Sequence, residues 1–336
     1  MKVFITGTSG FIGFHLAKLL LEEGHIVSGY DGLTDYYDVN LKLERTKILD
    51  SYDSFSNTQG MLENNELLTR VVGKFCPDVI VHLAAQAGVR YSLENPRAYI
   101  ESNIIGTFNV MEVARSLEVK HLLMASTSSV YGANKVMPFD ELQKADTPLT
   151  IYAATKKANE SMGHSYAHLW NLPITMFRFF TVYGPWGRPD MALFKFTEAM
   201  IKNEPIDIYN FGDMYRDFTY VEDLVRGIRL LIDTPPSQDK EIEPILKNDN
   251  RSPVAPFRVV NIGNSDKVRL LDFIEAIESE LDIKARRNMM PMQMGDVPAT
   301  WANSDLLHNL TGYQPETSYK EGVRKFIAWY KEYYNV

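Results

Sequence analysis

Short apolar runs recur along the first 180 residues of the chain. Lys2 to Thr6, His25 to Tyr30 and Asp78 to Leu83 are such runs, and Lys120 to Ala125 and Ile174 to Phe179 resemble them. None shows a regular alternation of polar and apolar positions. Strands that are covered on both faces have this pattern, which is typical of a parallel sheet.

The stretches between these runs have helical periodicity. Phe11 to Glu23 carries leucines at helical spacing and ends before Gly24, where a C-terminal cap is expected. Tyr99 to Leu117 and Tyr152 to Leu169 are also amphipathic. Strands that alternate with such helices predict an α/β fold, a doubly wound (Rossmann-like) parallel sheet over residues 1–180.

Residues 181–336 have a less regular pattern. Four stretches have helical periodicity: Leu193–Asn203, Val221–Asp233, Leu270–Leu281 and Tyr319–Tyr334. The polar, proline-rich stretch from Pro235 to Pro256 predicts a long surface excursion. We expect residues 181–336 to form a smaller α+β domain that shapes a substrate site, with some segments returning to the first domain.

Composition and charge narrow the function classes. Of 336 residues, 45% are hydrophobic and 23% are charged, which is ordinary for a globular protein. The net charge of −8 disfavours nucleic acid as a partner. No apolar run approaches the ~18 residues of a membrane helix, and the first residues lack signal-peptide features. We therefore expect a soluble cytoplasmic protein with no membrane partner.

Cysteine and histidine give no sign of a metal site. Cys76 is the single cysteine, so neither an intrachain disulfide nor a cysteine cluster for zinc can form, which suits a reducing cytoplasm. His164 and His168 are four residues apart, as zinc ligands can be, but no third ligand accompanies them. We expect a pair of histidines on one helix face and no bound metal.

A glycine-rich turn joins the first strand to the first helix. Gly7, Gly10 and Gly13 form the pattern G-x-x-G-x-x-G, with Phe11 and Ile12 between the last two glycines. Glycines at such a turn let the backbone approach a pyrophosphate, which then rests on the helix N-terminus. An ordinary glycine-rich turn is the alternative.

Asp31 ends the second strand, 18 residues after Gly13. A carboxylate at this position can accept both hydroxyl groups of an adenosine ribose and repels a 2′-phosphate. The following residues, Gly32 to Thr34, include no Lys or Arg that would attract such a phosphate. The pattern favours NAD over NADP, the alternative being a residue that only forms the turn.

Tyr152 and Lys156 are four residues apart and share one face of a predicted helix. An ammonium group beside the phenol would lower its pKa from ~10 and make it a usable base. Upstream, Ser126 to Ser129 supply four consecutive hydroxyl groups at the end of a strand, where folds of this class bind ligands. A solvated helix face and a hydroxyl-rich turn are the respective alternatives.

In this order, the features resemble the extended short-chain dehydrogenase/reductase superfamily, and within it the nucleotide-sugar epimerases, over essentially the whole chain. The resemblance implies that residues 1–180 bind NAD and that residues 181–336 bind a UDP-sugar. It implies Tyr152 as the catalytic base and Lys156 as its helper, which also holds the nicotinamide ribose. Thr127 would share the substrate hydroxyl with the tyrosine, and Ser128 and Ser129 would line the same pocket.

The resemblance also implies further cofactor contacts. The residues concerned are Leu83, Ala84, Ala85 and Gln86 under the cofactor, Asn103 on the cofactor side, and Phe179 beside the nicotinamide. One motif departs from the family. Met61 of Gly60-Met61-Leu62 stands where relatives have the aspartate that contacts adenine.

The run from Thr181 to Met191 and the run from Tyr36 to Lys42 are similar to those of the uronic acid epimerases. Thr181 stands where enzymes of neutral UDP-sugars commonly have asparagine. Its small hydroxyl leaves room for a C6 carboxylate, and Arg188 supplies a cation close by. A surface arginine near a turn is the alternative for Arg188.

Other positions match nucleotide-pocket elements of the family. Arg216 lies in an R-D-F element whose arginine grips the diphosphate, and Gln293 and Asp296 belong to a second element. Gln293 stands where relatives acting on neutral sugars often have arginine. Arg90 is a further candidate for the pocket.

The resemblance thus implies interconversion of UDP-glucuronate and UDP-galacturonate through a 4-keto intermediate, with transient reduction of bound NAD. It also implies a homodimer that serves polysaccharide biosynthesis. The alternatives are a UDP-glucose/galactose 4-epimerase and a UDP-glucuronate decarboxylase. A 4,6-dehydratase would need a carboxylate where Ser128 and Ser129 stand. From another class, a non-catalytic NAD-sensing regulator would not need the Thr127, Tyr152 and Lys156 set.

Overall fold

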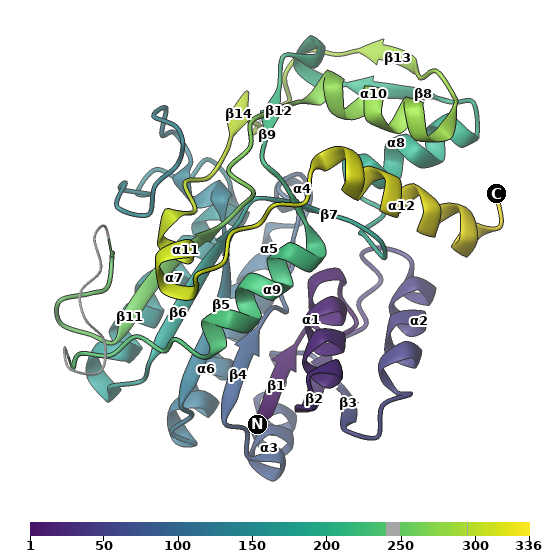
Figure 1. Ribbon diagram of the computed structural model, residues 1–336. Helices are drawn as coiled ribbons and strands as arrows, with labels where there is room; N and C mark the ends of the chain where they lie inside the picture. The colour runs from purple at the N-terminus through teal and green to yellow at the C-terminus, as the bar shows by residue number, and fades with distance from the viewer. Residues whose placement is uncertain (240–248, 294) are drawn as a thin grey trace.

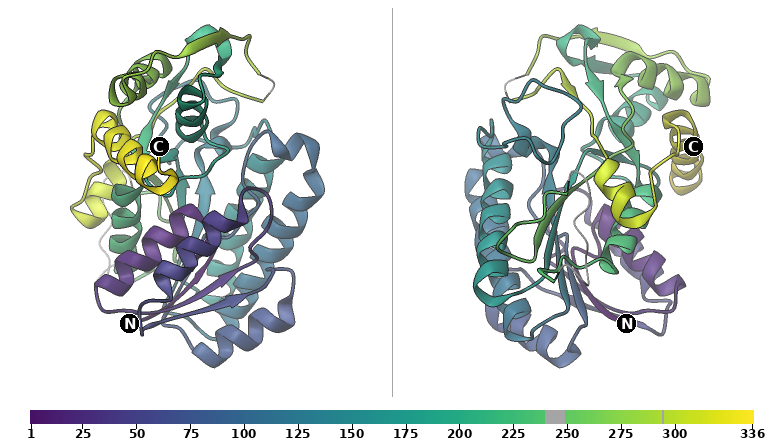
Figure 2. Two further views of the ribbon diagram at one scale, coloured as in Figure 1. Left: turned by 90° about the vertical axis from the view of Figure 1, so that its right-hand side faces the viewer. Right: turned by 60° about the vertical axis from the view of Figure 1, so that its left-hand side comes forward.

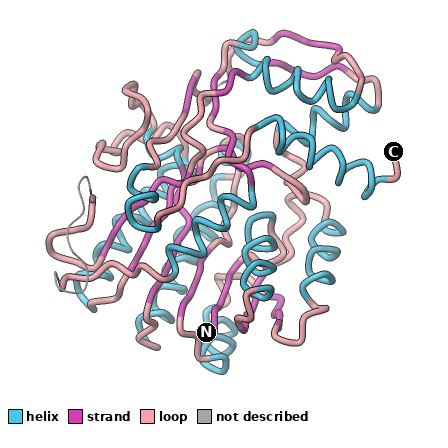
Figure 3. The backbone as a smooth tube through the Cα atoms, viewed as in Figure 1, coloured by secondary structure: helices cyan, strands magenta, loops and turns pink. Residues whose placement is uncertain are grey.

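The computed structural model describes residues 1–239, 249–293 and 295–336. A seven-stranded sheet runs through its larger part (Figures 1 and 3). The strand order is β11-β6-β5-β4-β1-β2-β3, and every neighbouring pair is parallel. The strands are β1 (Lys2–Thr6), β2 (Ile26–Asp31), β3 (Phe55–Gln59), β4 (Val79–His82), β5 (His121–Thr127), β6 (Ile174–Phe179) and β11 (Phe257–Ile262).

Helices cover both faces of this sheet (Figures 1 and 3). One core cluster joins the sheet to α1 (Phe11–Glu22), α9 (Val221–Ile232) and α11 (Asp305–Thr311). A second joins it to α3 (Asn65–Phe75), α6 (Thr107–Ser116) and α7 (Ile151–Trp170). α2 (Val39–Leu49) packs beside α1. The prediction of a doubly wound parallel sheet is confirmed.

The predicted helix from Tyr99 to Leu117 is confirmed, and residues 100–106 within it are π-helical. Three short elements, α4 (Tyr91–Glu94), α5 (Pro96–Tyr99) and the π-helical turn η1 (Ile100–Gly106), precede α6. A Cβ atom on Gly106 would lie 2.6 Å from the Cβ atom of Leu62, so this segment approaches the loop after β3 closely. Wide π-turns of this kind are frequent at functional sites.

The remaining elements form a smaller part above the carboxyl ends of the large sheet (Figure 2). It contains three small sheets, with the strand orders β8-β13, β12-β9-β14 and β7-β10. Its strands are β7 (Thr181–Tyr183), β8 (Pro205–Ile208), β9 (Tyr215–Arg216), β10 (Phe218–Tyr220), β12 (Val268–Arg269), β13 (Arg286–Met289) and β14 (Ala299–Thr300). Its helices are α8 (Ala192–Ile201), α10 (Leu270–Leu281) and α12 (Tyr319–Tyr334). The chain also forms two 3₁₀ turns: η2 (Ser128–Tyr131), directly after β5, and η3 (Tyr209–Gly212), after β8.

Residues beyond 180 contribute to both parts of the molecule. In the smaller part the ring of Phe218 stacks on that of Phe273 at 3.8 Å between centroids. In the larger part β11 pairs with β6 along its whole length, and α9 packs on α1. Of the predicted excursion from Pro235 to Pro256, residues 240–248 lie outside the described residues.

The described helices include none that is long and apolar enough to cross a membrane. Within the same residues, no group of three or more His, Cys, Asp or Glu side chains is placed to hold a metal ion. His164 binds the hydroxyl of Ser252 through Nε2 at 2.8 Å, and Nδ1 of His168 lies 2.7 Å from the carbonyl oxygen of Val254. The two histidines therefore have structural partners on a neighbouring loop.

Candidate active site

A cleft of about 440 Å³ lies at the carboxyl ends of the parallel strands. Residues at the carboxyl end of β5, and residues that follow β1, β2, β3, β4 and β6, contribute to its lining. The chain leaves β1 toward β2 and β3 and then returns to β4 on the other side of β1, so the strand order reverses between β1 and β4. Ligands of open α/β sheets bind at such a point.

The glycine-rich turn forms one wall of the cleft. Gly7 has a φ of +83°, and a Cβ atom there would lie 2.9 Å from the backbone nitrogen of Ala84. A Cβ atom on Gly13 would lie 2.0 Å from the carbonyl oxygen of Gly7. Both positions therefore require glycine. The N-terminal residues of α1, from Phe11 to Gly13, line the cleft, where their N–H groups have no acceptor within the helix.

Asp31 lines the next part of the cleft and is nearly buried, with 8% of its surface exposed. Its Oδ2 accepts a hydrogen bond from the backbone nitrogen of Ser9 at 2.9 Å, and its Oδ1 accepts one from Leu33 at 2.8 Å. These two bonds orient the carboxylate at the end of β2. The position agrees with the predicted ribose contact, which stays a prediction.

Lys42 is a cation at this end of the cleft that the sequence analysis missed. It lies on α2 and lines the cleft near Asp31, and its Nζ donates to the carbonyl oxygen of Thr34 at 2.5 Å. Burial lowers the pKa of Lys42, and the charge of Asp31 opposes that shift. The sequence analysis considered only Gly32 to Thr34, the three residues that follow β2, and these include no Lys or Arg. Lys42 is the last residue of the run from Tyr36 to Lys42, which the sequence analysis used only for the resemblance to the uronic acid epimerases.

The loop after β4 passes under the cleft and is braced by a buried asparagine. Leu83, Ala84, Ala85 and Gln86 all line the cleft. Asn103, in η1, accepts a hydrogen bond from the backbone nitrogen of Gln86 at 2.8 Å and donates to its carbonyl oxygen at 3.0 Å. It also donates to the hydroxyl of Thr155 at 3.2 Å. Asn103 thus ties this loop to α7 and does not itself line the cleft.

The predicted catalytic residues meet in the same cleft. Tyr152 and Lys156 enter it from α7, and Thr127 enters it from the end of β5. The hydroxyl of Thr150 accepts a hydrogen bond from the backbone nitrogen of Ala153 at 3.2 Å and caps the start of α7. This cap places Tyr152 in the first turn of the helix. Phe179, from the end of β6, lines the cleft as well.

The ionisation of Tyr152 differs from the prediction. Burial raises the pKa of Tyr152, while a hydrogen bond with Thr127 and the charge of Arg188 lower it less strongly. The predicted lowering by Lys156 is wrong for the protein without a bound cofactor. The ammonium group of Lys156 donates to the carbonyl oxygen of Ala125 at 3.0 Å, and burial lowers its own pKa to about 8.

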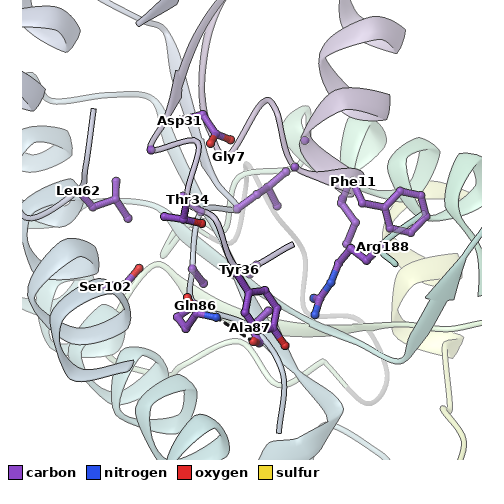
Figure 4. A pocket seen from close by; sticks show the side chains of 18 of the residues that line it. Gly7, Phe11, Asp31, Thr34, Tyr36, Leu62, Gln86, Ala87, Ser102 and Arg188 are labelled. Carbon is purple, nitrogen blue, oxygen red and sulfur yellow. Dashed lines mark hydrogen bonds between the residues drawn. The ribbon is translucent and has the colours of Figure 1, made fainter. Parts of the chain in front are cut away.

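Arg188 reaches the cleft from the loop after β7 (Figure 4). It forms an ion pair with Asp190. Its Nε donates to Oδ1 of Asp190 at 2.9 Å, and its Nη2 donates to Oδ2 at 2.5 Å. The hydroxyl of Tyr36 donates to the same carboxylate at 3.2 Å. Burial disfavours the charge of Arg188, but Asp190 outweighs burial, so the pKa of Arg188 rises and that of Asp190 falls.

The loop that carries Arg188 is anchored by Arg45, which the sequence analysis also missed. Arg45 is completely buried on α2. Its guanidinium donates to the carbonyl oxygens of Ser9 at 2.9 Å, Trp186 at 2.6 Å and Gly187 at 3.3 Å, and to the hydroxyl of Tyr37 at 2.8 Å. One side chain therefore joins the glycine-rich turn to the loop of Arg188.

Thr181 and two of the predicted serines lie next to the cleft and do not line it. Thr181 lines a small cavity of about 20 Å³ that it shares with Phe11 and Arg188. Ser128 and Ser129 are half-buried directly after Thr127. Four residues line both the cleft and this small cavity: Phe11, Val182, Arg188 and Met191.

The predicted nucleotide-pocket residues come together in the smaller part of the molecule, outside the cleft lining. Nη2 of Arg216 donates to Oδ1 of Asp296 at 2.8 Å, so these two predicted residues form an ion pair. The buried Oε1 of Gln293 has no hydrogen-bond partner among the described residues. Arg90 is exposed and lies over the ring of Tyr209 in η3, at 4.7 Å from its centroid.

The chain was compared with protein families and with known proteins. Residues 3–244 match the model of the NAD dependent epimerase/dehydratase family. The chain is 54% identical over 334 residues to a probable UDP-glucuronate 4-epimerase of Rhizobium meliloti, covering 99% of this chain and 98% of that protein. It is 42% identical to UDP-glucuronate 4-epimerase 4 of Arabidopsis thaliana, covering 100% of this chain and 76% of that protein.

The chain is also similar to solved structures. The model matches the UDP-glucuronic acid 4-epimerase of Bacillus cereus in complex with UDP-glucuronic acid and NAD. The TM-score is 0.87 at 30% sequence identity, and the match covers 99% of this chain and all of that one.

Proposed function

The chain belongs to the NAD-dependent epimerase/dehydratase family, and on that premise we propose that it is a UDP-glucuronate 4-epimerase. The reaction interconverts UDP-glucuronate and UDP-galacturonate through a 4-keto sugar, with NAD as the cofactor. Like the R. meliloti relative, which it matches over nearly the full length of both chains, this protein would act on the uronic acid form of the sugar.

One observation of the site carries the proposal. The guanidinium of Arg188 and the phenol of Tyr152 line the same cleft, and the charge of Arg188 lowers the pKa of Tyr152. A cation whose charge reaches this phenol is suited to a substrate whose carboxylate lies two carbons from the reacting C4. The C6 carboxylate is the only charge that separates UDP-glucuronate from UDP-glucose.

Tyr152, Thr127 and Lys156 would move the proton. Tyr152 takes the proton of the C4 hydroxyl and returns it to the same oxygen after the sugar has turned in the cleft. Thr127 holds that oxygen by a hydrogen bond and, because it also bonds to Tyr152, opposes the effect of burial on the phenol. Lys156 is fixed against Ala125 at the base of the cleft, where its charge can reach the cofactor ribose.

The residues of the cleft fit NAD. Gly7, Gly10 and Gly13 leave room for a pyrophosphate at the N-terminus of α1, where free N–H groups and the helix dipole favour an anion. Asp31 would hold the adenosine ribose. The segment from Leu83 to Gln86, and Phe179, would lie along the dinucleotide. When bound, NAD supplies a hydride acceptor and a positively charged ring that favours the tyrosinate form of Tyr152.

The UDP end of the substrate would extend into the smaller part of the molecule. We assign the diphosphate to Arg216, whose ion pair with Asp296 keeps its guanidinium in place. Gln293 has a buried oxygen without a described partner that a donor on the nucleotide would satisfy. Arg90 would close this end from the other side, and Ser128, Ser129 and Thr181 would surround the sugar.

Incubation of the purified protein with UDP-glucuronate, with the products resolved by NMR, tests the proposal. We expect UDP-galacturonate. Release of UDP-pentose as the main product would identify a decarboxylase. Conversion of UDP-glucose in preference to the uronate would identify a neutral-sugar epimerase. NAD binding without turnover of either substrate would indicate a non-catalytic NAD-sensing regulator.

Oligomeric state and location are also proposals. We propose a homodimer, supported by exposed apolar side chains on neighbouring elements of one face: Ile105, Phe108 and Leu169. Light scattering coupled to size-exclusion chromatography tests it. We place the enzyme in the cytoplasm, where its single cysteine would stay reduced and where its product would supply polysaccharide biosynthesis.

A further inference from the structure

The end of the cleft beyond Asp31 is formed by the segment that follows β3. β3 is the edge strand next to β2, so the residues after it lie on the far side of Asp31 from Tyr152. Gly60, Met61, Leu62 and Glu63 all line the cleft here. In Figure 4, Leu62 and Ser102 lie at this end and Arg188 lies at the other. A dinucleotide whose ribose meets Asp31 would place its purine at this end.

The walls of this end suit a flat ring. A Cβ atom on Gly32 would lie 2.5 Å from Sδ of Met61, so the thioether covers the backbone directly after Asp31. Leu62 is buried, and its side chain is held against Gly106 of η1. Thioether and aliphatic groups offer dispersion contacts to the faces of a purine. They offer nothing to its polar edge.

Glu63 is the carboxylate that remains available at this end. It is half-buried in the cleft wall, and its charge is close enough to Tyr30 to help burial raise the pKa of that hydroxyl. The hydroxyl of Tyr30 donates to the carbonyl oxygen of Met61 at 3.0 Å and is therefore already engaged. Oε2 of Glu63 is buried and has no hydrogen-bond partner in the described part of the chain. A carboxylate in this state gains when a donor arrives.

A second glutamate at this end of the cleft has a partner. Glu101 also lines the cleft, from η1, but its Oε1 accepts a hydrogen bond from Nε of Arg97 at 2.7 Å. We propose that Glu63 accepts a hydrogen bond from the exocyclic 6-amino group of adenine. The inference rests on the use of NAD in the proposed function, and it does not depend on which sugar the enzyme takes.

Nicotinamide hypoxanthine dinucleotide tests this contact, because it carries a carbonyl oxygen in place of the 6-amino group. The holoprotein is incubated with an excess of an equimolar mixture of this analogue and isotope-labelled NAD. When the ratio of the two bound dinucleotides is constant, it is measured by mass spectrometry. For the wild type we expect NAD to be preferred by about ten- to a hundredfold, the range for a hydrogen bond to a charged acceptor. A ratio near one would overturn the proposal.

Two variants assign the preference to a residue. In Glu63→Gln the amide can also donate to the carbonyl oxygen of the analogue, so we expect the preference for NAD to fall about fivefold or more. Glu66→Gln, which removes an exposed acid that is not part of the cleft lining, should keep the wild-type ratio. If Glu63→Gln keeps the wild-type ratio, or if Glu101→Gln lowers it instead, the assignment to Glu63 is wrong. All these readouts concern cofactor binding, so a protein that bound NAD but failed to epimerise UDP-glucuronate would still give a clear result.

Discussion

The guanidinium of Arg188 and the carboxylate of Asp190 form a two-point ion pair at the edge of the cleft, with N–O distances of 2.9 and 2.5 Å. The cation that we assign to the substrate carboxylate is therefore balanced by an anion of the protein. A uronate must share Arg188 with Asp190 or displace it. The two residues should consequently be tested as a pair.

Removal of Arg188 alone should be more harmful than removal of both partners. Arg188→Ala leaves the Asp190 carboxylate facing the carboxylate of the substrate. We expect the KM for UDP-glucuronate to rise by about ten- to a hundredfold, as for loss of a charged hydrogen bond. The double variant Arg188→Ala/Asp190→Ala should recover at least part of that loss, because the repelling anion is gone. Steady-state kinetics of the two variants, with UDP-glucose as the neutral control, measure this; a double variant as poor as the single one would contradict it.

The pH profile of Asp190→Asn should shift toward acid. The charge of Arg188 lowers the pKa of Tyr152, and the Asp190 carboxylate partly cancels that charge. Without the carboxylate, the pKa of Tyr152 should fall, so its base form is present at lower pH. The acidic limb of the profile of kcat/KM for UDP-glucuronate against pH should therefore move to lower pH. A limb that stays at the same pH or moves to higher pH would contradict this influence of Asp190 on the phenol.

The sheet and most of the cleft were predictable, for a common reason. Non-alternating apolar runs identified the parallel strands, and residues at the ends of such strands meet at one edge. Gly7, Asp31 and Thr127 accordingly line one cleft, although up to 120 positions separate them in the sequence. The helix from Ile151 to Trp170 was recognisable from its period.

Features that depend on a partner far away in the sequence were not predictable. Arg45 gave no signal, because three of its four acceptors are backbone carbonyls, which any residue could supply. The raised pKa of Tyr152 comes chiefly from burial, which a helix-face pattern does not reveal. The pairing of β11 with β6 joins segments more than 80 residues apart. These contacts follow from tertiary packing and have no local pattern.

Arg45→Met should loosen the loop of Arg188 and destabilise the fold. The variant leaves the carbonyl groups of Ser9, Trp186 and Gly187 without their donor in a buried place. We expect the free energy of unfolding to fall by about 2–4 kcal/mol, the cost of a few unsatisfied buried acceptors after relaxation. The KM for UDP-glucuronate should rise more than that for UDP-glucose. Urea denaturation and kinetics measure the two effects, and Arg97→Ala, which removes an exposed arginine, is the control.

Tyr152→Phe should separate chemistry from cofactor binding. The phenol is the group that we expect to move the proton in both half-reactions, and a phenyl ring keeps its contact with the ring of Tyr99. Turnover of UDP-glucuronate should fall by at least about three orders of magnitude, within the range for loss of a general base, while NAD stays bound. Turnover is measured by NMR, and bound NAD is measured after denaturation. Near-normal turnover would remove Tyr152 from the mechanism.

The burial of Lys156 should be visible in the dependence of stability on pH. Burial lowers the pKa of this ammonium group from 10.5 to about 8. Below pH 8 the group is charged in both the folded and the unfolded chain, so the folded state bears the full cost of burying a charge. Between pH 8 and 10.5 the unfolded chain binds more protons than the folded one, so stability relative to a chain without this group must rise with pH. A difference of 2.5 pH units corresponds to about 3 kcal/mol.

Urea denaturation of the nucleotide-free wild type and of Lys156→Met tests this. The free energy of unfolding of the wild type minus that of the variant should increase between pH 8 and 10.5. A difference that is constant with pH would mean that Lys156 keeps an ordinary pKa in the folded protein.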